Sequence, residues 1–169
     1  MQIPSDEYNP YYKPYIEKVR LQGSIWQTLK AQGETIYAFY KGIPVEKHDF
    51  AYKEGKWTVK EVLLHITDTE RIFAYRALRI ARKDKTPLPG FDQDVFVAQS
   101  NATSRPITSI LEEYKAVRTA TVTMFESFSD EVLKRKGCAS ESEVSVRALG
   151  FMIAGHEKHH QQIIKERYL

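Results

Sequence analysis

The sequence lacks several features that would each indicate a particular class of protein. It contains a single cysteine, Cys138, which cannot form a disulfide within the chain, so nothing requires an oxidising compartment. This cysteine lies in a predicted loop without a neighbouring histidine, and we interpret it as incidental. No apolar run reaches the roughly 20 residues that cross a bilayer, and the first residues lack the pattern of a signal peptide. We therefore expect a cytoplasmic protein that does not enter a membrane.

An excess of charge of one sign is also missing. The 25 Lys and Arg residues stand against 22 Asp and Glu residues, which gives a formal net charge of +3. Nucleic-acid binders usually concentrate positive charge on one face or tail, and no run of like charges does so here. A nucleic-acid partner is therefore not expected. A length of 169 residues with 42% hydrophobic content is typical of a single globular domain over residues 1–169.

Apolar residues recur with helical spacing along most of the chain. This spacing predicts four amphipathic helices, at 24–41, 58–82, 107–127 and 145–169. The second is the clearest, because Thr58 and Glu61 have the pattern of a capping box at its start. Residues 1–20 are rich in Tyr and Pro, which predicts an irregular segment lying on the domain. A short helix is expected over 129–136 and a turn over 137–143.

Four long helices in a chain of this length predict an all-α fold, most simply a four-helix bundle. No strand pattern or internal repeat is apparent. The connectors at 42–57 and 84–105 are long, so the topology need not be a simple up-and-down arrangement.

The last predicted helix carries two histidines within its apolar stripe. His156 and His160 are four residues apart, so their side chains face the same way. Two imidazoles placed in this way can bind one metal ion at a distance of about 2.0–2.1 Å. A third ligand is available in His65, which borders the inward stripe of the second predicted helix. Three neutral ligands leave positions open for water or substrate, as in a catalytic site.

Each of these histidines has a plainer alternative as a hydrogen-bonded core residue. His159 would point roughly 100° away from His160, so we expect an edge residue rather than a partner of a ligand, and His48 is expected to face solvent. Residues 156–160 (HEKHH) also match the HExxH motif of zinc metalloproteases, in which Glu is the general base. Only nine residues follow the last of these histidines, which leaves little room for a downstream third ligand, so a protease is not expected.

Longer segments around these histidines carry a family resemblance. They are WTVKEVLLH (57–65), DTERIFAYRALRIAR (68–82), PLPGFD (87–92) and SVRALGFMIAGHEKHHQQIIKERYL (145–169). On these residues the chain resembles the DinB/YfiT-like superfamily of metal-dependent enzymes, over nearly its whole length. The most specific part is a tryptophan-led helix with one histidine, combined with a terminal G-H-x-x-H-H helix.

The resemblance implies a DinB-type four-helix bundle that is often a homodimer. It implies that His65, His156 and His160 bind one divalent ion, nickel or zinc. Imidazole ligands suit both ions, so the residues do not identify which one is bound. It also implies a small-molecule substrate that is hydrolysed or joined to a low-molecular-weight thiol. The alternative is a metal-binding protein of the stress response that catalyses nothing, because a fold does not fix an activity.

One acidic residue is predicted to take part in catalysis. Asp68 lies three residues after His65 on the same side of the helix, so it could accept a hydrogen bond from a ligand or reach the open site. The alternative for Asp68 is a salt bridge at the helix surface with Arg71 or Arg76.

Further residues could serve the site if they face it. Asp92 and Gln93 in the long connector could cover the metal. Arg76 and Arg79, if they point inward, would suit an anionic substrate, although exposure to solvent is the commoner position for arginine.

Overall fold

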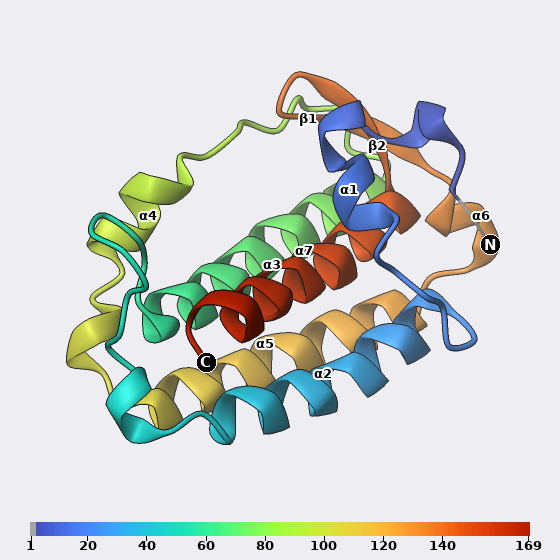
Figure 1. Cartoon of the computed structure of the whole chain (residues 1–169). Helices are drawn as coiled ribbons and strands as arrows, with labels where there is room; N and C mark the ends of the chain where they lie inside the picture. Colours follow the sequence, from blue (N-terminus) through green and yellow to red (C-terminus); the bar gives the residue numbers. More distant parts are fainter. Residues whose placement is uncertain (1–2) are drawn as a thin grey trace.

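The computed structural model describes residues 3–169 and shows a helical bundle (Figure 1). Its long helices are α2 (Ile25–Lys41), α3 (Val59–Ala81), α5 (Ile107–Glu126) and α7 (Val146–Arg167). Helix α3 lies beside α7 and α2 beside α5, and further contacts of α3 with α5 and of α2 with α7 join the two pairs. The predicted all-α four-helix bundle is confirmed, and each helix lies within two residues of its predicted bounds.

Capping side chains define where the long helices begin. The Thr58 hydroxyl accepts a hydrogen bond from the Glu61 amide at 3.2 Å, and the Glu61 carboxylate accepts one from the Thr58 amide at 2.7 Å. This is the predicted capping box, and Ser24 and Gln27 form a second one at the start of α2. The hydroxyl of Ser145 caps α7 by accepting from the Ala148 amide at 3.0 Å.

The long connectors contain short helices of their own. The first includes the 3-10 turn η3 (Val45–Lys47). The second includes α4 (Gln93–Gln99) and the 3-10 turn η4 (Ala102–Ser104), which were not predicted. Helix α6 (Asp130–Leu133) lies within the predicted short helix at 129–136.

The Tyr/Pro-rich start of the chain packs on the bundle, as expected. It forms η1 (Ser5–Glu7), η2 (Pro10–Tyr12) and the single turn α1 (Lys13–Ile16), and α1 contacts α7 (Figure 1). The contact depends on Gly155, because a Cβ there would lie 2.0 Å from the carbonyl oxygen of Tyr15. Glycine thus allows α1 to approach α7 closely.

A β-hairpin lies where only a turn was predicted. Strands β1 (Lys136–Ala139) and β2 (Ser142–Ser145) pair antiparallel, so the prediction of no strand was wrong. Ser140 and Glu141 form the connection with φ angles of 49° and 60°, as the two-residue turns of hairpins require. Such turns usually contain Asn or Gly, and neither residue is present here. The sequence therefore gives no indication of the turn.

The hairpin also binds the second long connector. The Leu88 amide donates to the carbonyl of Cys138 at 3.0 Å, and the Ser140 amide donates to the carbonyl of Leu88 at 2.9 Å. Cys138 therefore lies in a paired strand and not in a loop, which corrects its predicted location.

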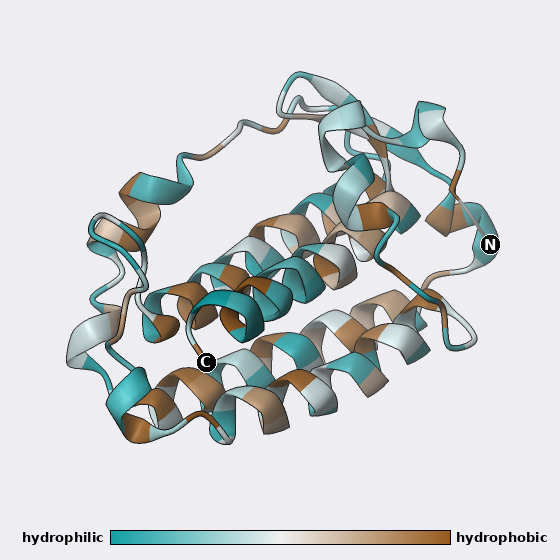
Figure 2. Cartoon of the chain, in the orientation of Figure 1, coloured by the Kyte–Doolittle hydropathy of each residue, from teal (hydrophilic) through white to brown (hydrophobic). Residues whose placement is uncertain are grey.

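A polar layer divides the apolar core into two clusters. One cluster contains Leu29, Phe73 and Phe125, and the other contains Ile36 and Tyr114. Buried polar residues from all four long helices meet there, among them Gln32, Glu70, Arg118 and Glu157. Figure 2 shows hydrophilic residues interrupting the hydrophobic stretches of these helices. Within residues 3–169, no helix combines the length and the apolar character needed to cross a membrane.

Candidate metal centre

Three histidine side chains from two helices meet on one side of the bundle. The Nε2 atom of His156 lies 3.1 Å from Nε2 of His65 and 3.1 Å from Nε2 of His160. Ligand atoms of all three residues lie within 4.8 Å of one another. His156 and His160 are one turn apart on α7, and the packing of α3 beside α7 brings His65 to them. The structure thus brings together all three of the predicted ligands.

This set of donors fits a divalent metal ion. Two nitrogens bound to one tetrahedral ion at the usual distance are about 3.3 Å apart, close to the observed separation of 3.1 Å. Burial lowers the pKa of His65 to about 4 and that of His160 to about 3, and it lowers the pKa of His156 well below its ordinary value. All three imidazoles are therefore neutral at pH 7, so each has a lone pair available for a metal.

Aromatic rings surround the three ligands. The Trp57 ring lies 4.6 Å from the His65 ring and stacks at 6.4 Å on the His160 ring. The Tyr15 ring meets the His156 ring edge-on at 5.5 Å. Among the described residues, none accepts a hydrogen bond from an Nδ1 atom of the three histidines. Aromatic packing therefore holds the orientation of the ligand rings.

Asp68, the predicted catalytic residue, lies outside the group of three histidines. Its Oδ1 atom accepts a hydrogen bond from Nη1 of Arg71 at 3.1 Å, and the same Nη1 atom pairs with Glu113 at 2.6 Å. Burial raises the pKa of the Asp68 carboxyl. The salt bridge with Arg71 is the alternative considered from the sequence, and a role of Asp68 in catalysis stays a prediction.

The other two histidines do not belong to the three-histidine group, although the His159 ring lies 5.2 Å from the His160 ring. His159 is half-buried at the edge of α7, with its ring 5.2 Å from that of Tyr15. His48 is half-buried, and its Nε2 atom lies 3.0 Å from the carbonyl oxygen of Ile43. The prediction that His48 faces solvent was wrong, because η3 folds its ring back onto that carbonyl.

Two pockets border the histidine pair of α7. One, of about 340 Å³, is lined in part by His156, and the other, of about 240 Å³, is lined in part by His160. Gln93, the first residue of α4, lines both pockets. It therefore lies near the site, and whether it covers the metal stays a prediction, whereas the Asp92 carboxylate caps α4 by accepting from the Asp94 amide at 2.9 Å.

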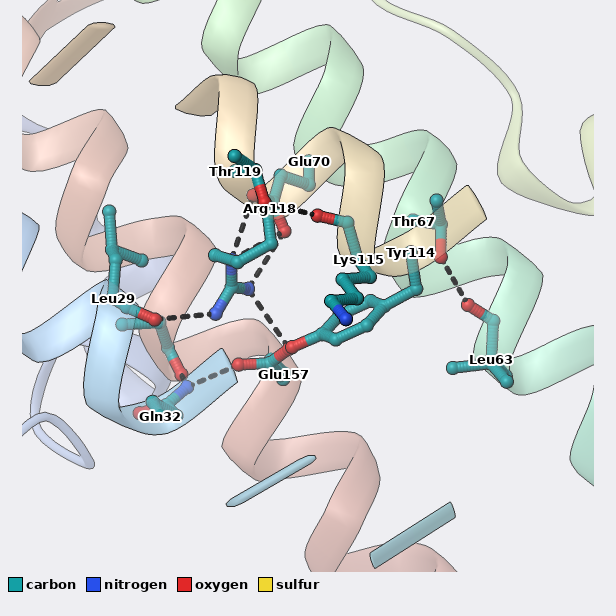
Figure 3. Close-up of polar contacts among 11 residues, drawn as sticks. Leu29, Gln32, Leu63, Thr67, Glu70, Tyr114, Lys115, Arg118, Thr119 and Glu157 are labelled. Atoms are coloured by element: carbon teal, nitrogen blue, oxygen red, sulfur yellow. Dashed lines mark hydrogen bonds and ion pairs between the residues drawn. The ribbon is translucent and has the colours of Figure 1, made fainter. Parts of the chain in front are cut away.

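A buried ionic cluster lies at the polar layer and joins the long helices (Figure 3). Nη2 of Arg118 donates to Glu70 at 2.7 Å and to Glu157 at 2.9 Å. The second oxygen of Glu157 accepts from Nε2 of Gln32 at 2.6 Å, and the hydroxyl of Tyr114 donates to Glu157 as well. Sequence reasoning missed this cluster, although Glu70 and Arg118 both occupy core positions in the helical spacing.

The contacts of Glu157 in this cluster argue against a metalloprotease site. In an HExxH site the glutamate acts as general base beside the metal. Here both oxygens of Glu157 are bound by residues of α2 and α5 (Figure 3), and the three histidines meet between α3 and α7. Glu157 is therefore a structural residue in this fold.

Comparisons with known proteins agree with this architecture. The family model described as the DinB superfamily matches residues 28–164. A "putative metal-dependent hydrolase" of Oceanobacillus iheyensis is 27% identical over 135 residues, covering 79% of this chain and 75% of the relative. A protein of the same name from Geobacillus thermodenitrificans is 23% identical over 129 residues, covering 75% of this chain and 72% of the relative.

Two solved structures from Bacillus subtilis share the fold. YfiT, described as a "probable metal-dependent hydrolase with an unusual four-helix bundle topology", superposes with a TM-score of 0.73 at 16% identity, covering 98% of this chain and 94% of YfiT. The DinB-like protein YjoA superposes with a TM-score of 0.61 at 18% identity, covering 85% of this chain and 88% of YjoA. At these identities the similarity shows the fold alone.

Proposed function

Because the chain belongs to the DinB superfamily and brings together three neutral histidines, two of which line pockets, we propose that it is a divalent-metal-dependent hydrolase of a small molecule. The observation that carries the proposal is the meeting of three Nε2 atoms from α3 and α7. The names of the curated relatives support hydrolysis as the reaction.

His65, His156 and His160 would hold the ion, for which zinc and nickel are the candidates. An ion bound there supplies Lewis acidity, which polarises a substrate oxygen and lowers the pKa of water. The three imidazoles are neutral, so they do not reduce the positive charge at the centre. Trp57 and Tyr15 pack against the ligand rings, which orients them and excludes water from their faces.

The same geometry supports a second candidate reaction. The pockets of about 340 and 240 Å³ border different ligands, His156 and His160, so two small molecules have room beside the centre. Transfer of a low-molecular-weight thiol to an electrophile would use both pockets, whereas hydrolysis needs one pocket and water. A purely metal-binding role is less well supported, because within residues 3–169 no fourth His, Cys, Asp or Glu joins the group to close it.

His160→Ala and His159→Ala form a matched pair of variants that tests the proposal. They remove neighbouring imidazoles from the same helix, but only His160 belongs to the three-histidine group. After loading with zinc or nickel, we expect about one ion per chain in the wild type and in His159→Ala, and almost none in His160→Ala, by elemental analysis. Circular dichroism should show that both variants remain helical.

Activity assays then separate the candidate reactions. A panel of esters and amides tests hydrolysis, and a panel of thiols with a common electrophile tests thiol transfer. Turnover that depends on metal and is lost in His160→Ala supports an enzyme. Full metal loading without turnover in either panel would favour the metal-binding alternative, and unchanged metal content in His160→Ala would refute the site itself.

Three further proposals accompany this function. If Asp68 takes part in catalysis, Asp68→Asn should lower turnover while metal content stays unchanged. Turnover equal to that of the wild type would mean that Asp68 only forms its salt bridge with Arg71.

A homodimer is expected from the family resemblance, which light scattering at several protein concentrations tests. A cytoplasmic location is also expected, and cell fractionation tests it.

A further inference from the structure

The pocket beside His156 contains one charged side chain among its described residues, and it is an arginine. The pocket volume of about 340 Å³ suits part of a small molecule. Five aromatic side chains line it, namely Tyr11, Tyr12, Tyr15, Phe73 and Phe91. Arg76 lines the same pocket and is only 3% exposed. Of the two arginines considered for an anionic substrate, Arg76 thus points inward, whereas Arg79 is paired with Asp84 at the surface.

Arg76 is buried without a neutralising carboxylate. Nη2 donates to the carbonyl of Pro89 at 2.7 Å and to the hydroxyl of Ser140 at 2.9 Å, and both acceptors are uncharged. Within residues 3–169 no Asp or Glu oxygen lies within 4.0 Å of its guanidinium group, in contrast to buried Arg118 with its two glutamates. Tyr12 supplies no charge, because burial raises the pKa of its phenol. Buried charges in proteins are normally paired, so the guanidinium group of Arg76 favours an anionic ligand in this pocket.

A second polar group in this pocket also lacks a partner. The Oγ1 atom of Thr69 is fully buried and forms no hydrogen bond with the described residues, while Thr69 lines the pocket. Thr69 lies four residues after His65 and seven before Arg76, so the three share one face of α3. A buried hydroxyl without a partner is costly, and a ligand extending along α3 would satisfy it.

We propose that this pocket binds the substrate of the metal centre through an anionic oxygen group, a carboxylate or a phosphate, held by Arg76. The aromatic walls receive the apolar part of the molecule, and Thr69 contributes a hydrogen bond between the two ends. His65 and Arg76 are separated by about 16 Å along the axis of α3. The reacting bond and the anionic group therefore lie at opposite ends of an elongated molecule. The identification of this ligand as a substrate rests on the proposed function, whereas the anion site itself does not.

Binding of phenylacetate to the zinc-loaded protein tests the proposal without any turnover. Phenylacetamide has the same shape without the charge, and phenyl phosphate tests a phosphate in place of a carboxylate. By calorimetry we expect one of the two anions to bind at least about ten-fold more tightly than the amide, as a charge-assisted hydrogen bond should provide. Equal affinity for phenylacetate, phenyl phosphate and phenylacetamide would overturn the proposal.

Variants assign the anion to Arg76 or to the metal. Arg76→Gln should weaken anion binding about ten-fold or more while zinc content stays at the wild-type value, and Arg76→Lys should recover part of the loss. Arg79→Gln removes a charge from the same helix outside the pocket and should bind as the wild type does. Anion binding that persists in Arg76→Gln and disappears on removal of zinc would place the anion on the metal and refute the assignment.

Two more variants separate binding from the structural role of Arg76 at the hairpin. Ser140→Ala removes one acceptor of Arg76 but keeps the charge, so anion affinity should stay within about two-fold of the wild type. An equal loss in Ser140→Ala and Arg76→Gln would show that hairpin anchoring, and not charge, determines affinity. Thr69→Val should weaken anion binding a few-fold without changing zinc content. Loss of hydrolysis with anion binding intact would refute the proposed function and leave this site standing.

Discussion

His156 and Glu157 are neighbours in sequence, but their side chains point to different sides of α7. Nε2 of His156 lies 3.1 Å from His65 on α3, whereas Glu157 accepts a hydrogen bond from Nη2 of Arg118 on α5 at 2.9 Å. Successive residues on a helix point about 100° apart, so one turn of α7 supplies both a metal ligand and a member of the ionic cluster. The position of the metal centre is thereby tied to the packing of all four helices.

Arg118→Gln should be among the most destabilising single substitutions in the chain. It would leave Glu70 and Glu157 buried without their shared cation. Removal of one partner of a buried ion pair costs about 3–5 kcal/mol in free energy of unfolding. Urea unfolding in the presence of a chelator measures this cost without a contribution from bound metal.

Arg71→Gln is the matched control at the surface. Arg71 also joins two carboxylates, Asp68 and Glu113, but its side chain is 45% exposed. We expect a cost of about 0–1 kcal/mol, as for other exposed pairs. Similar costs for the two arginines would show that burial of the Arg118 cluster has no energetic consequence.

The metal-free protein should lose stability as the pH falls below about 6.5. Burial lowers the pKa of His65 to about 4 and that of His160 to about 3 from an ordinary value of 6.5. Below pH 6.5 the unfolded chain therefore binds protons that the folded chain does not, until the pH reaches those lowered values. Each such histidine contributes a slope of up to about 1.4 kcal/mol per pH unit.

His65→Gln should reduce this slope between pH 6.5 and 4, as measured by urea unfolding at several pH values with a chelator present. The carboxylates that titrate near the lower limit are common to both proteins and cancel in the comparison. An unchanged slope would mean that the His65 imidazole is already protonated in the folded protein at these pH values.

Bound metal should stabilise the fold through its preference for the folded chain. At a free zinc concentration of 100 times Kd, linkage predicts a gain of about 2.7 kcal/mol in free energy of unfolding. Thermal unfolding of the wild type with and without zinc measures the gain, which should be absent in His65→Ala. A similar gain in that variant would place the zinc elsewhere on the protein.

The sequence predicted the helices and the histidine pair because both follow from periodicity. Residues facing the core of α3 recur every three or four positions, and the same rule places His156 and His160 on one face of α7. The hairpin escaped prediction because Ser140 and Glu141 are unusual residues for a turn with two positive φ angles.

The polar layer was missed for a different reason. Charged residues are usually exposed, so Glu70 and Arg118 were not assigned to the core although their spacing placed them there. Glu70 is four residues after Ile66, and Arg118 is four residues after Tyr114, and both of these apolar residues are buried. The spacing of the three histidines also does not identify the ion, because imidazole suits both zinc and nickel.

Gly155→Ala should displace α1 from α7 and disturb the pocket beside His156. The new Cβ would lie 2.0 Å from the carbonyl oxygen of Tyr15, which is backbone and cannot rotate away. Alanine favours a helix over glycine by about 1 kcal/mol, but overpacking typically costs about 1–3 kcal/mol. We therefore expect a net loss of stability, together with weaker binding of phenylacetate because Tyr15 lines its pocket.

Gly42→Ala provides the comparison for this last substitution. Its nearest neighbour would be the carbonyl oxygen of Ala38 at 3.4 Å, an ordinary contact, so stability should change by less than about 1 kcal/mol. Thermal unfolding and phenylacetate calorimetry on both variants complete the test. If Gly155→Ala proved as stable as the wild type and bound phenylacetate equally well, the close approach of α1 to α7 would not be needed to form the pocket.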